Sequence, residues 1–340
     1  MNYWDSVKMA AEELPIRNGR FLITGATGLI GSCIVDVLLY ANENLKANFE
    51  IYAMSRSSER LEKRFGTKIY PVIQDICEPL DVTKSYDYIL HAASNADPKA
   101  YAMYPAETAL INVIGTRNVL EYCKVHLRTN MVFMSTFEVY GTIEGESVYS
   151  EDAVGIIDFH RLRNAYPESK RCAELVLEGY VEEYGVDAKI ARLASIYGPT
   201  MLENDSKAHA QFIRKAVSKE NIVLKSEGLP KRTYCYVIDA VSAIFTVAFR
   251  GEAGEAYNIA NEKSVASIAE VAQRCAEIAG TKVVYELPEA LEQKGFSVPQ
   301  NCILENQKLR ELGWKGKYTL IDGLKETIQT IKMRNEYGKI

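Results

Sequence analysis

Short unbroken runs of apolar residues recur along the first two hundred residues, and stretches with a helical spacing of apolar positions separate them. Runs of this kind, bounded by polar and turn-forming residues, are typical of strands that are buried on both faces. Strands are expected at residues 21–23, 49–54, 68–73, 86–90, 130–134 and 188–193, and helices at 3–14, 32–39, 106–124 and 169–184. This alternation predicts an α/β fold with a Rossmann-type, doubly wound parallel sheet.

The pattern changes near residues 198–199, beyond which short strands and helices follow in no regular order. We therefore expect residues 1–195 to form the Rossmann dinucleotide-binding domain, with residues 235–260 returning to it. Residues 196–234 and 261–340 are expected to form a smaller, mixed substrate-binding lobe. Because ligands of open α/β sheets bind at the carboxyl ends of the strands, this lobe is expected to close over a substrate there.

Composition narrows the possible classes of protein. With 340 residues, 47% of them hydrophobic, the chain can bury a large core. The net charge of −5 argues against a dedicated nucleic-acid binder, and no apolar segment is long enough to span a membrane. The N-terminus lacks the features of a signal peptide, and the seven scattered cysteines suit reduced thiols, so we expect a cytoplasmic protein. The four histidines lack ligand spacing, and no metal is expected.

Three glycines follow the first expected strand with the spacing G-x-x-G-x-x-G, and a helical pattern follows them. In a dinucleotide site, Gly25 permits the tight turn, Gly28 lets the backbone approach a pyrophosphate, and Gly31 lets helix and strand pack closely. The helix N-terminus then offers free N–H groups to the phosphates. A glycine-rich turn without a ligand is the alternative interpretation. The cofactor-binding residues expected in this turn are Gly25, Thr27, Gly28, Leu29, Ile30 and Gly31.

The end of the second expected strand bears on the choice between NAD and NADP. An NAD site usually places an acid there, and here Ser55 stands in that place and Arg56 follows it. Because arginine pairs with a 2′-phosphate through a bidentate fork, this favours NADP slightly over NAD. The alternative is that Arg56 is an ordinary surface arginine.

Tyr166 and Lys170 are four residues apart at the start of an expected helix and therefore share one face of it. Pro167 between them fits only in the first helical turn. A lysine cation and a positive nicotinamide would lower the pKa of the tyrosine, which could then take a proton from a substrate alcohol as hydride leaves its carbon. Thr136, just past the strand at 130–134, could hydrogen-bond the reacting oxygen.

Glu138 lies two residues beyond Thr136 and admits two interpretations. It is either a second acid or base near the substrate or a solvated loop carboxylate. The order of the glycine turn, the Thr136–Glu138 segment and the Tyr166/Lys170 pair favours an enzyme over a module that only binds a nucleotide.

With these motifs the chain resembles the extended short-chain dehydrogenase/reductases, in particular the NAD(P)-dependent nucleotide-sugar epimerase/dehydratase family. The resemblance covers nearly the whole length and includes Tyr166 and Lys170 as the family's catalytic pair. It implies that Asp75 and Ile76 bind the adenine end of the cofactor and that four residues after the strand at 86–90 line the cofactor. These four residues are His91-Ala92-Ala93-Ser94. Further matches are Asn112 in the motif at 112–116 and the segments at 192–199, 228–232, 236–239, 257–260 and 312–314.

The resemblance also implies a mechanism. Tyr166 abstracts a hydroxyl proton while hydride passes to the cofactor, Thr136 hydrogen-bonds the resulting ketone, and Lys170 holds the cofactor ribose. Glu138 before Val-Tyr-Gly is similar to 4,6-dehydratases and UDP-glucuronate decarboxylases, whereas Phe137 replaces the aspartate of one dehydratase class.

The substrate-binding residues implied by the resemblance depart from the usual pattern. Ser195 stands where many relatives have asparagine, and Thr200 stands where decarboxylases often have arginine. Arg232 lies in the segment that is similar to the diphosphate-binding one. Gln300 lies in a segment without the arginine that commonly holds the nucleotide.

We therefore predict an enzyme that modifies a nucleotide-diphosphate sugar through a transient 4-keto-sugar, with dehydratase or decarboxylase chemistry favoured. A 4-epimerase and an NADPH-dependent keto-sugar reductase are the enzymatic alternatives, and a non-catalytic NAD(P)-binding sensor is the alternative from another class. The resemblance implies a role in surface polysaccharide or deoxysugar synthesis. It also implies a homodimer formed through helices at 106–126 and 165–184.

Overall fold

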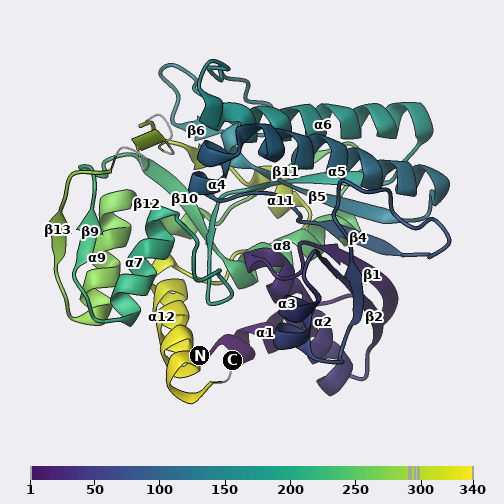
Figure 1. Ribbon diagram of the computed structural model, residues 1–340, viewed down its shortest axis with the longest axis horizontal. Helices are drawn as coiled ribbons and strands as arrows, with labels where there is room; N and C mark the ends of the chain where they lie inside the picture. The colour runs from purple at the N-terminus through teal and green to yellow at the C-terminus, as the bar shows by residue number, and fades with distance from the viewer. Residues whose placement is uncertain (1, 290–292, 295, 297–298, 339–340) are drawn as a thin grey trace.

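A computed structural model describes residues 2–289, 293–294, 296 and 299–338 of the chain (Figure 1). Its centre is a seven-stranded sheet with the order β3-β2-β1-β4-β5-β7-β11. Every neighbouring pair in it is parallel. The strands are β1 (Asn18–Thr24), β2 (Asn48–Ser55), β3 (Tyr70–Ile73), β4 (Tyr88–His91), β5 (Asn130–Thr136), β7 (Ala188–Leu193) and β11 (Ala256–Ile259). The predicted fold class is confirmed.

Helices cover both faces of this sheet, as a doubly wound fold requires. Figure 1 shows α5 (Pro105–Val125) and α6 (Ala165–Tyr184) along one face, and α2 (Leu29–Asn44) and α8 (Val237–Arg250) on the other. Alanine, valine, isoleucine and phenylalanine side chains of α8 pack against β5 and β7. The helix predicted at 3–14 is α1 (Tyr3–Glu12), which lies on α2 and α8.

Two short helices near the sheet were not predicted. In α3 (Ser58–Phe65), only Leu61 and Phe65 are buried, so its apolar pattern is too short to recognise. The six-residue α4 (Pro98–Met103) buries only Tyr101. Asp97 begins α4 by accepting hydrogen bonds from the backbone N–H groups of Lys99 and Ala100 at 3.0 and 3.2 Å.

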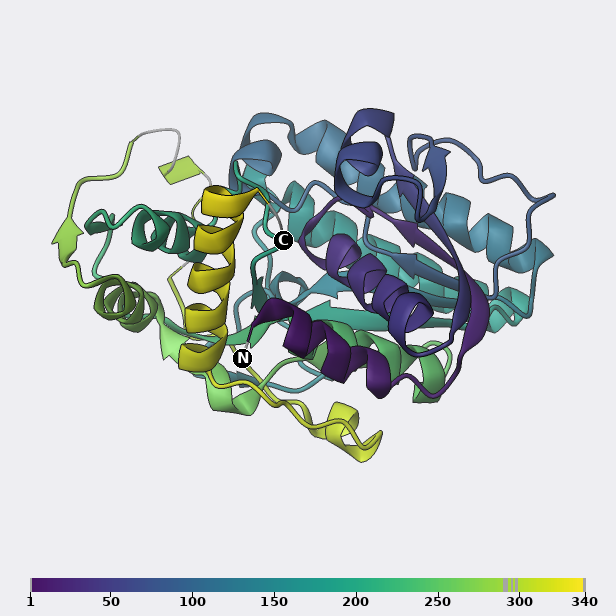
Figure 2. The same ribbon diagram turned by 90° about the horizontal axis from the view of Figure 1, so that it is seen from below.

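A smaller mixed lobe lies beside the sheet, on the left in Figures 1 and 2. It contains small sheets of β12-β10-β8 and β13-β9, and β14 pairs with β6 at its border. The strands are β6 (Val148–Tyr149), β8 (Ser195–Tyr197), β9 (Ile222–Leu224), β10 (Lys231–Tyr236), β12 (Val265–Ser267), β13 (Val283–Tyr285) and β14 (Ile303–Leu304). The helices are α7 (Ala208–Val217), α9 (Ile268–Ala279), α11 (Gln307–Glu311) and α12 (Leu320–Tyr337).

The expectation of only short elements beyond residue 199 is wrong for two helices. The 14-residue α8 and the 18-residue α12 are among the longer helices of the chain. Placement of α8 and β11 on the large sheet agrees with the predicted return of residues 235–260, while the domain division itself stays a prediction.

The N-terminal helix joins the sheet half to the lobe (Figure 2). The Tyr3 hydroxyl donates to Asp36 Oδ2 on α2 at 2.7 Å. The Ser6 hydroxyl donates to Glu326 Oε1 on α12 at 2.7 Å and accepts from the Tyr318 hydroxyl at 2.6 Å. All five side chains are buried or nearly so, so these contacts fix the lobe against the sheet. No helix within the described residues combines the length and the apolar character needed to cross a membrane.

Candidate active site

The glycine turn lies between β1 and α2, at the carboxyl edge of the sheet. Gly25 has a φ of +66°, and a Cβ there would lie 2.9 Å from the Ala92 carbonyl. A Cβ on Gly31 would lie 2.3 Å from the Gly25 carbonyl oxygen. Gly28 begins α2 without a side-chain cap, so the first N–H groups of the helix remain available to an anion. Thr27, Leu29 and Ile30 are partly exposed on the same turn. These features fit a dinucleotide pyrophosphate.

A buried histidine fixes the loop beside this turn. Thr24 Oγ1 accepts a hydrogen bond from the Ala93 N–H at 3.1 Å and lies within hydrogen-bonding distance of His91 Nδ1, at 2.8 Å. The other ring nitrogen of His91, Nε2, lies 3.3 Å from Thr116 Oγ1. Burial lowers the pKa of His91 to about 3, so the ring is neutral. The backbone of Ala92 and Ala93 is thereby held against Gly25.

Asn112 connects this loop to the helix that carries Tyr166. Its Oδ1 accepts from the Ser94 hydroxyl at 2.7 Å, and its Nδ2 donates to Ser169 Oγ at 2.9 Å. The Ser169 hydroxyl in turn donates to the Tyr166 carbonyl at 3.0 Å. Asn112 is only 1% exposed, so the structure shows it as a link within the protein. Its contact with a cofactor stays a prediction.

The residues expected near the adenine and its ribose lie together where the neighbouring strands β2 and β3 end. Asp75 Oδ1 accepts from the Cys77 N–H at 2.9 Å, and the Ile76 carbonyl accepts from Asn118. Arg56 lies with one guanidinium nitrogen 3.6 Å from Asp75 Oδ2 and 3.9 Å from Glu107 Oε1. Ser55 Oγ accepts from the Ser57 N–H at 3.2 Å. Arg56 is thus paired with two carboxylates, and neither pairing was predicted from the sequence.

Tyr166 and Thr136 meet where α6 begins and β5 ends. Both are buried, at 7% and 6% exposure. Burial raises the pKa of Tyr166 and the nearby Glu138 carboxylate raises it further, whereas a hydrogen bond with Thr136 and the charge of Arg163 lower it. The Tyr166 phenol is therefore protonated at neutral pH in the unliganded protein.

Lys170 lies one turn after Tyr166, as its spacing predicts, but its contacts are with β5. The ammonium donates to the Met134 carbonyl at 2.7 Å and lies 4.4 Å from the centre of the Phe133 ring. Burial lowers the pKa of Lys170 to about 7. Sequence reasoning assigned the tuning of Tyr166 to Lys170, whereas the opposing positive charge in this structure belongs to Arg163.

Glu138 lies in the short 3₁₀ helix η1 (Phe137–Tyr140) and forms a buried ion pair. Its Oε2 accepts from Arg163 at 2.8 Å, and the two side chains are 16% and 6% exposed. The interpretation of Glu138 as a solvated loop carboxylate is therefore wrong. Arg163 comes from a second 3₁₀ helix, η2 (Leu162–Asn164), and also donates to the Tyr101 hydroxyl at 3.0 Å. The Tyr101 ring stacks on Tyr166, with centroids 5.0 Å apart.

Sequence reasoning missed Arg163 and Tyr101. Arg163 stands three residues before Tyr166, which was a usable signal. Nothing in the sequence near Tyr101 indicated its place against Tyr166.

The three residues expected to contact substrate lie on the lobe side of η1. The guanidinium of Arg232 on β10 lies 5.6 Å from the centre of the Phe137 ring. Gln300 donates to the Gly141 carbonyl at 2.7 Å, and its buried Oε1 has no hydrogen-bond partner among the described residues. Ser195 opens β8 and pairs with Tyr234, two residues from Arg232. The structure therefore brings Arg232 and Gln300 to the Phe137–Gly141 segment.

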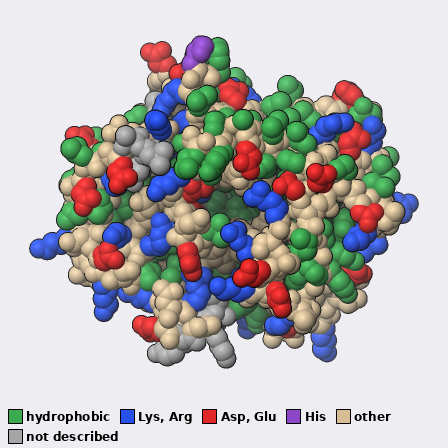
Figure 3. All heavy atoms as spheres, in the orientation of Figure 1, with side chains coloured by type: hydrophobic (Ala, Val, Ile, Leu, Met, Phe, Trp, Pro, Cys, Tyr) green, Lys and Arg blue, Asp and Glu red, His purple; other side chains and the backbone are tan. Residues whose placement is uncertain are grey.

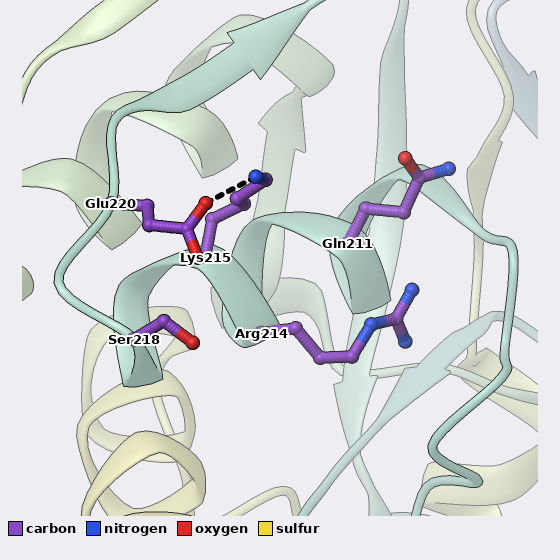
Figure 4. Close-up of a pocket in the computed structure, with 5 residues that line it drawn as sticks. All are labelled: Gln211, Arg214, Lys215, Ser218 and Glu220. Atoms are coloured by element: carbon purple, nitrogen blue, oxygen red, sulfur yellow. Dashed lines mark hydrogen bonds and ion pairs between the residues drawn. The ribbon is translucent and has the colours of Figure 1, made fainter.

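The face seen in Figure 3 is hollowed near its centre, with lysine, arginine and acidic side chains around the hollow. A separate pocket of about 180 Å³ lies on α7 and the segment after it (Figure 4). Its lining includes Arg214 and an ion pair of Lys215 with Glu220, and it contains none of the predicted site residues. Among the described residues no cluster of three or more histidine, cysteine or acidic side chains is arranged to hold a metal.

Comparison with known proteins identifies the family of the chain. Residues 21–260 match the NAD dependent epimerase/dehydratase family. UDP-glucuronic acid decarboxylase 6 of Arabidopsis thaliana is 30% identical over 329 residues, which cover 94% of this chain and 93% of that protein.

Two solved structures share the fold. UDP-glucose 4-epimerase of Thermotoga maritima with UDP-glucose superposes with a TM-score of 0.78 at 24% identity, over 93% of this chain and 99% of that one. The dTDP-glucose 4,6-dehydratase of Streptomyces venezuelae with NAD bound gives 0.77 at 24% identity, over 94% and 98%.

Proposed function

The chain belongs to the NAD-dependent epimerase/dehydratase family, and we propose that it decarboxylates a nucleotide-linked uronic acid. The observation that carries this proposal is the pair Phe137 and Glu138 beside Tyr166. Loss of water from a sugar needs an acid that protonates the leaving hydroxyl, and Phe137 has no proton to give. Loss of carbon dioxide needs no such acid. The similarity to UDP-glucuronic acid decarboxylases over nearly the whole of both chains supports the same choice.

The glycine turn, with His91 to Ser94 and Asp75, is proposed to hold the cofactor. When bound, a nicotinamide dinucleotide accepts hydride from the sugar and returns it. Sequence alone favoured NADP because of Arg56. The carboxylates of Asp75 and Glu107 beside Arg56 offset its charge and would repel a 2′-phosphate, so we place NAD ahead of NADP.

Tyr166, Thr136 and Lys170 are proposed to carry out the oxidation and the final reduction. Tyr166 accepts the proton of the sugar 4-hydroxyl as hydride leaves C4, and Thr136 hydrogen-bonds the same oxygen. A phenol with a raised pKa needs a positive charge to reach this state, and Arg163 faces it. Lys170 would turn from the Met134 carbonyl to the cofactor ribose. Tyr166 returns the proton to the oxygen at C4 when the ketone is reduced.

The ketone makes the uronic acid a β-keto acid. The bond between C5 and C6 breaks, its electron pair moves to the oxygen at C4, and carbon dioxide leaves. Thr136 and Tyr166 stabilise the enolate oxygen through hydrogen bonds. C5 then takes up one proton from water, and Glu138 is proposed to orient this water, which is supported by the contact of its carboxylate with Arg163 beside Tyr166.

One observation favours a 4-epimerase as the second candidate. Thr200 stands where decarboxylases often have arginine, and its hydroxyl donates to the Leu29 carbonyl at 2.7 Å. The chain therefore carries no cation at this position. An epimerase needs only the oxidation, a turn of the keto-sugar and the reduction, for which Thr136, Tyr166 and Lys170 suffice.

The experiment is mass spectrometry of the purified enzyme with NAD or NADP in heavy water. Substrates are the UDP-, GDP-, dTDP- and CDP-linked uronic acids and hexoses. Loss of carbon dioxide with one deuterium at C5 supports the decarboxylase. A product of unchanged mass and altered retention would establish the epimerase instead, and loss of water would overturn the argument from Phe137.

The partner is proposed to be a nucleotide-diphosphate sugar, with Arg232 on its diphosphate and Ser195 and Gln300 nearby. A homodimer through α5 and α6 is also proposed. Leu110 on α5 and Leu175 on α6 are 54% and 70% exposed, which agrees with a covered surface in a dimer. Light scattering of the wild type and of Leu175→Glu tests the assembly.

A further inference from the structure

Four side chains from four separate elements form one buried cluster at the proposed reaction centre. Tyr101 comes from α4, Glu138 from η1, Arg163 from η2 and Tyr166 from α6. Tyr101, Arg163 and Tyr166 are 3%, 6% and 7% exposed. Arg163 is the one cation of this cluster and donates hydrogen bonds to two of its members, the Tyr101 hydroxyl and the Glu138 carboxylate.

We propose that Arg163 is a positioning residue that sets the Glu138 carboxylate and, through Tyr101, the plane of the Tyr166 ring. This rests on the proposed function only in taking Tyr166 and Glu138 as the groups that face the sugar. Arg163 itself touches neither cofactor nor reacting atoms in this assignment.

The geometry of one guanidinium carries the proposal. A single terminal nitrogen donates to Glu138 Oε2 at 2.8 Å and to the Tyr101 hydroxyl at 3.0 Å. The other terminal nitrogen donates to Asn164 Oδ1 at 3.2 Å. The Asn164 amide donates to the Asp158 carbonyl at 2.7 Å, which anchors η2. A planar fork can make these contacts together, whereas a lysine ammonium presents one point of charge.

Tyr101 transmits this position to Tyr166. The Arg163 carbon Cζ lies 5.0 Å from the Tyr101 ring centre, and the two tyrosine rings stack 5.0 Å apart at an interplanar angle of 18°. The helix that carries Tyr101 is held at its other end, because Asp97 Oδ2 accepts from the Ser206 N–H at 2.6 Å. The Tyr101 ring is therefore fixed by Arg163 at its hydroxyl and by the lobe at its backbone.

The positive charge of Arg163 supports the same role for this residue as its hydrogen bonds do. The groups that face Tyr166 are Glu138, Thr136, Arg163 and the Tyr101 ring, and Lys170 on the same helix is turned to the Met134 carbonyl. Arg163 lowers the pKa of Tyr166, and Glu138 raises it. Without Arg163, the Tyr166 pKa moves further up, so a rate that depends on Tyr166 as a base needs a higher pH.

The test compares Arg163→Met, Arg163→Lys, Tyr101→Leu and Tyr101→Phe with the wild type. Arg161→Met is the matched control, since Arg161 lies two residues away, is partly exposed and contacts the Phe296 carbonyl. We expect Arg163→Met to lower kcat about 100-fold, with KM for the sugar and Kd for the cofactor within threefold. The low-pH limb of its kcat profile moves to higher pH. Arg163→Lys restores part of kcat, and Arg161→Met changes nothing.

Tyr101 separates positioning from simple packing. Tyr101→Phe keeps the ring and loses one hydrogen bond, so a small loss of kcat is expected, whereas Tyr101→Leu removes the stack and is expected to lose kcat at least 10-fold. If Arg163→Met does not fold, Arg163→Lys and Tyr101→Leu decide the matter. Unchanged kcat and pH profile in a folded Arg163 variant, or equal losses in kcat and in cofactor affinity, would overturn the proposal.

A second readout keeps this test independent of the proposed function. Reduced nicotinamide absorbs in the near ultraviolet. Hydride transfer can therefore be followed in a single turnover, separately from the release of carbon dioxide. If the wild type transfers hydride and releases no carbon dioxide, the decarboxylase proposal fails, and Arg163 is judged on the hydride step. If the wild type does both and the Arg163 variants equal it in both, only the positioning proposal fails.

Discussion

The two halves of the site are built in different ways. On the proposed cofactor side, the site consists mainly of backbone: the Gly25 turn, the uncapped start of α2 and the loop held by His91. On the proposed substrate side, charged and aromatic side chains from α4, η1, η2 and β10 meet. The geometry of the proposed cofactor side depends on close backbone approaches that leave no room for a Cβ atom. The geometry of the proposed substrate side depends on paired charged side chains.

This difference teaches where specificity resides. A pyrophosphate is the same in every relative, so a backbone turn that excludes Cβ atoms serves all of them. The sugar differs between relatives, and Phe137, Glu138 and Arg232 are side chains that can change one at a time. We therefore expect substitutions on the proposed cofactor side to abolish cofactor binding whichever sugar is the substrate. Substitutions on the proposed substrate side are expected to alter the rate and the product.

The largest effect is expected from Tyr166→Phe, which removes one oxygen from the substrate side. Turnover should fall about 10³-fold because the proton of the 4-hydroxyl loses its acceptor, while cofactor affinity stays within threefold. Steady-state kinetics and cofactor fluorescence measure both. Tyr180→Phe, towards the other end of the same helix, is the control, since its hydroxyl pairs with Glu121 and Arg117 on α5. Turnover above a tenth of the wild type would remove Tyr166 from the mechanism.

Gly31→Ala tests the cofactor side. Its Cβ would lie 2.3 Å from the Gly25 carbonyl oxygen, so turn and helix must separate, at a cost of about 3 kcal/mol in unfolding free energy or cofactor binding. Gly179→Ala on α6 is the matched control, because a Cβ there meets no described atom within 4 Å. Calorimetry and cofactor titration should show loss in the first variant and none in the second. Normal cofactor affinity in Gly31→Ala contradicts the assigned turn.

Lys170 sits between the two halves and gives a prediction for pH. The pKa of Lys170 is lowered to about 7 by burial, from an ordinary value of 10.5. Below pH 7 both folded and unfolded chains hold the proton, and from about pH 7 to 10.5 only the unfolded chain does. Wild-type stability therefore gains from Lys170 as pH rises through this window, by about 2 kcal/mol between pH 7 and 9.

Lys170→Met removes that gain. Relative to the wild type, the variant should be most stable at pH 6 and lose its advantage towards pH 9, as denaturant unfolding at each pH would show. Lys8→Met, on the exposed side of α1, is the control and should keep a constant difference. A constant difference for Lys170→Met as well would mean that Lys170 is not held neutral by burial.

The smallest effect is expected at Arg56, which is 63% exposed on its side chain. Arg56→Ala should change the ratio of kcat/KM for NAD over NADP by less than about fivefold, because the pairing with Asp75 and Glu107 already offsets its charge. Kinetics with both cofactors measure this ratio. A loss of NADP use beyond 50-fold would restore the NADP assignment that sequence alone favoured.

The sequence was sufficient to predict site residues whose contacts lie within one turn or one helix. Gly25 and Gly31 are required by close approaches within one turn, and the i, i+4 spacing places Tyr166 and Lys170 on one face. It was insufficient where the contact joins distant segments. Tyr101 reaches Tyr166 from α4, and Thr200 reaches Leu29 from the lobe, and no spacing rule connects these pairs.

The helix α12 was missed for another physical reason. Its buried face carries Leu324, Ile328 and Ile331, which would indicate a helix, but Glu326, Thr327 and Thr330 are buried among them. Glu326 accepts hydrogen bonds from Ser6 and Tyr236, so a polar residue lies where the helical pattern expects an apolar one. Polar contacts between helices therefore hide the periodicity on which the sequence analysis depends.

The position of β11 has a consequence for how the chain folds during synthesis. β11 pairs with β7 at the sheet edge, yet much of the lobe is made between them. Until residue 259 has left the ribosome, β7 exposes unpaired N–H and C=O groups along a flat parallel edge. Such long-range pairing forms slowly, so the nascent chain passes through a stage in which another chain can pair with that edge. Slowing translation only once residue 259 has left the ribosome, and not before, is expected to raise the yield of folded protein.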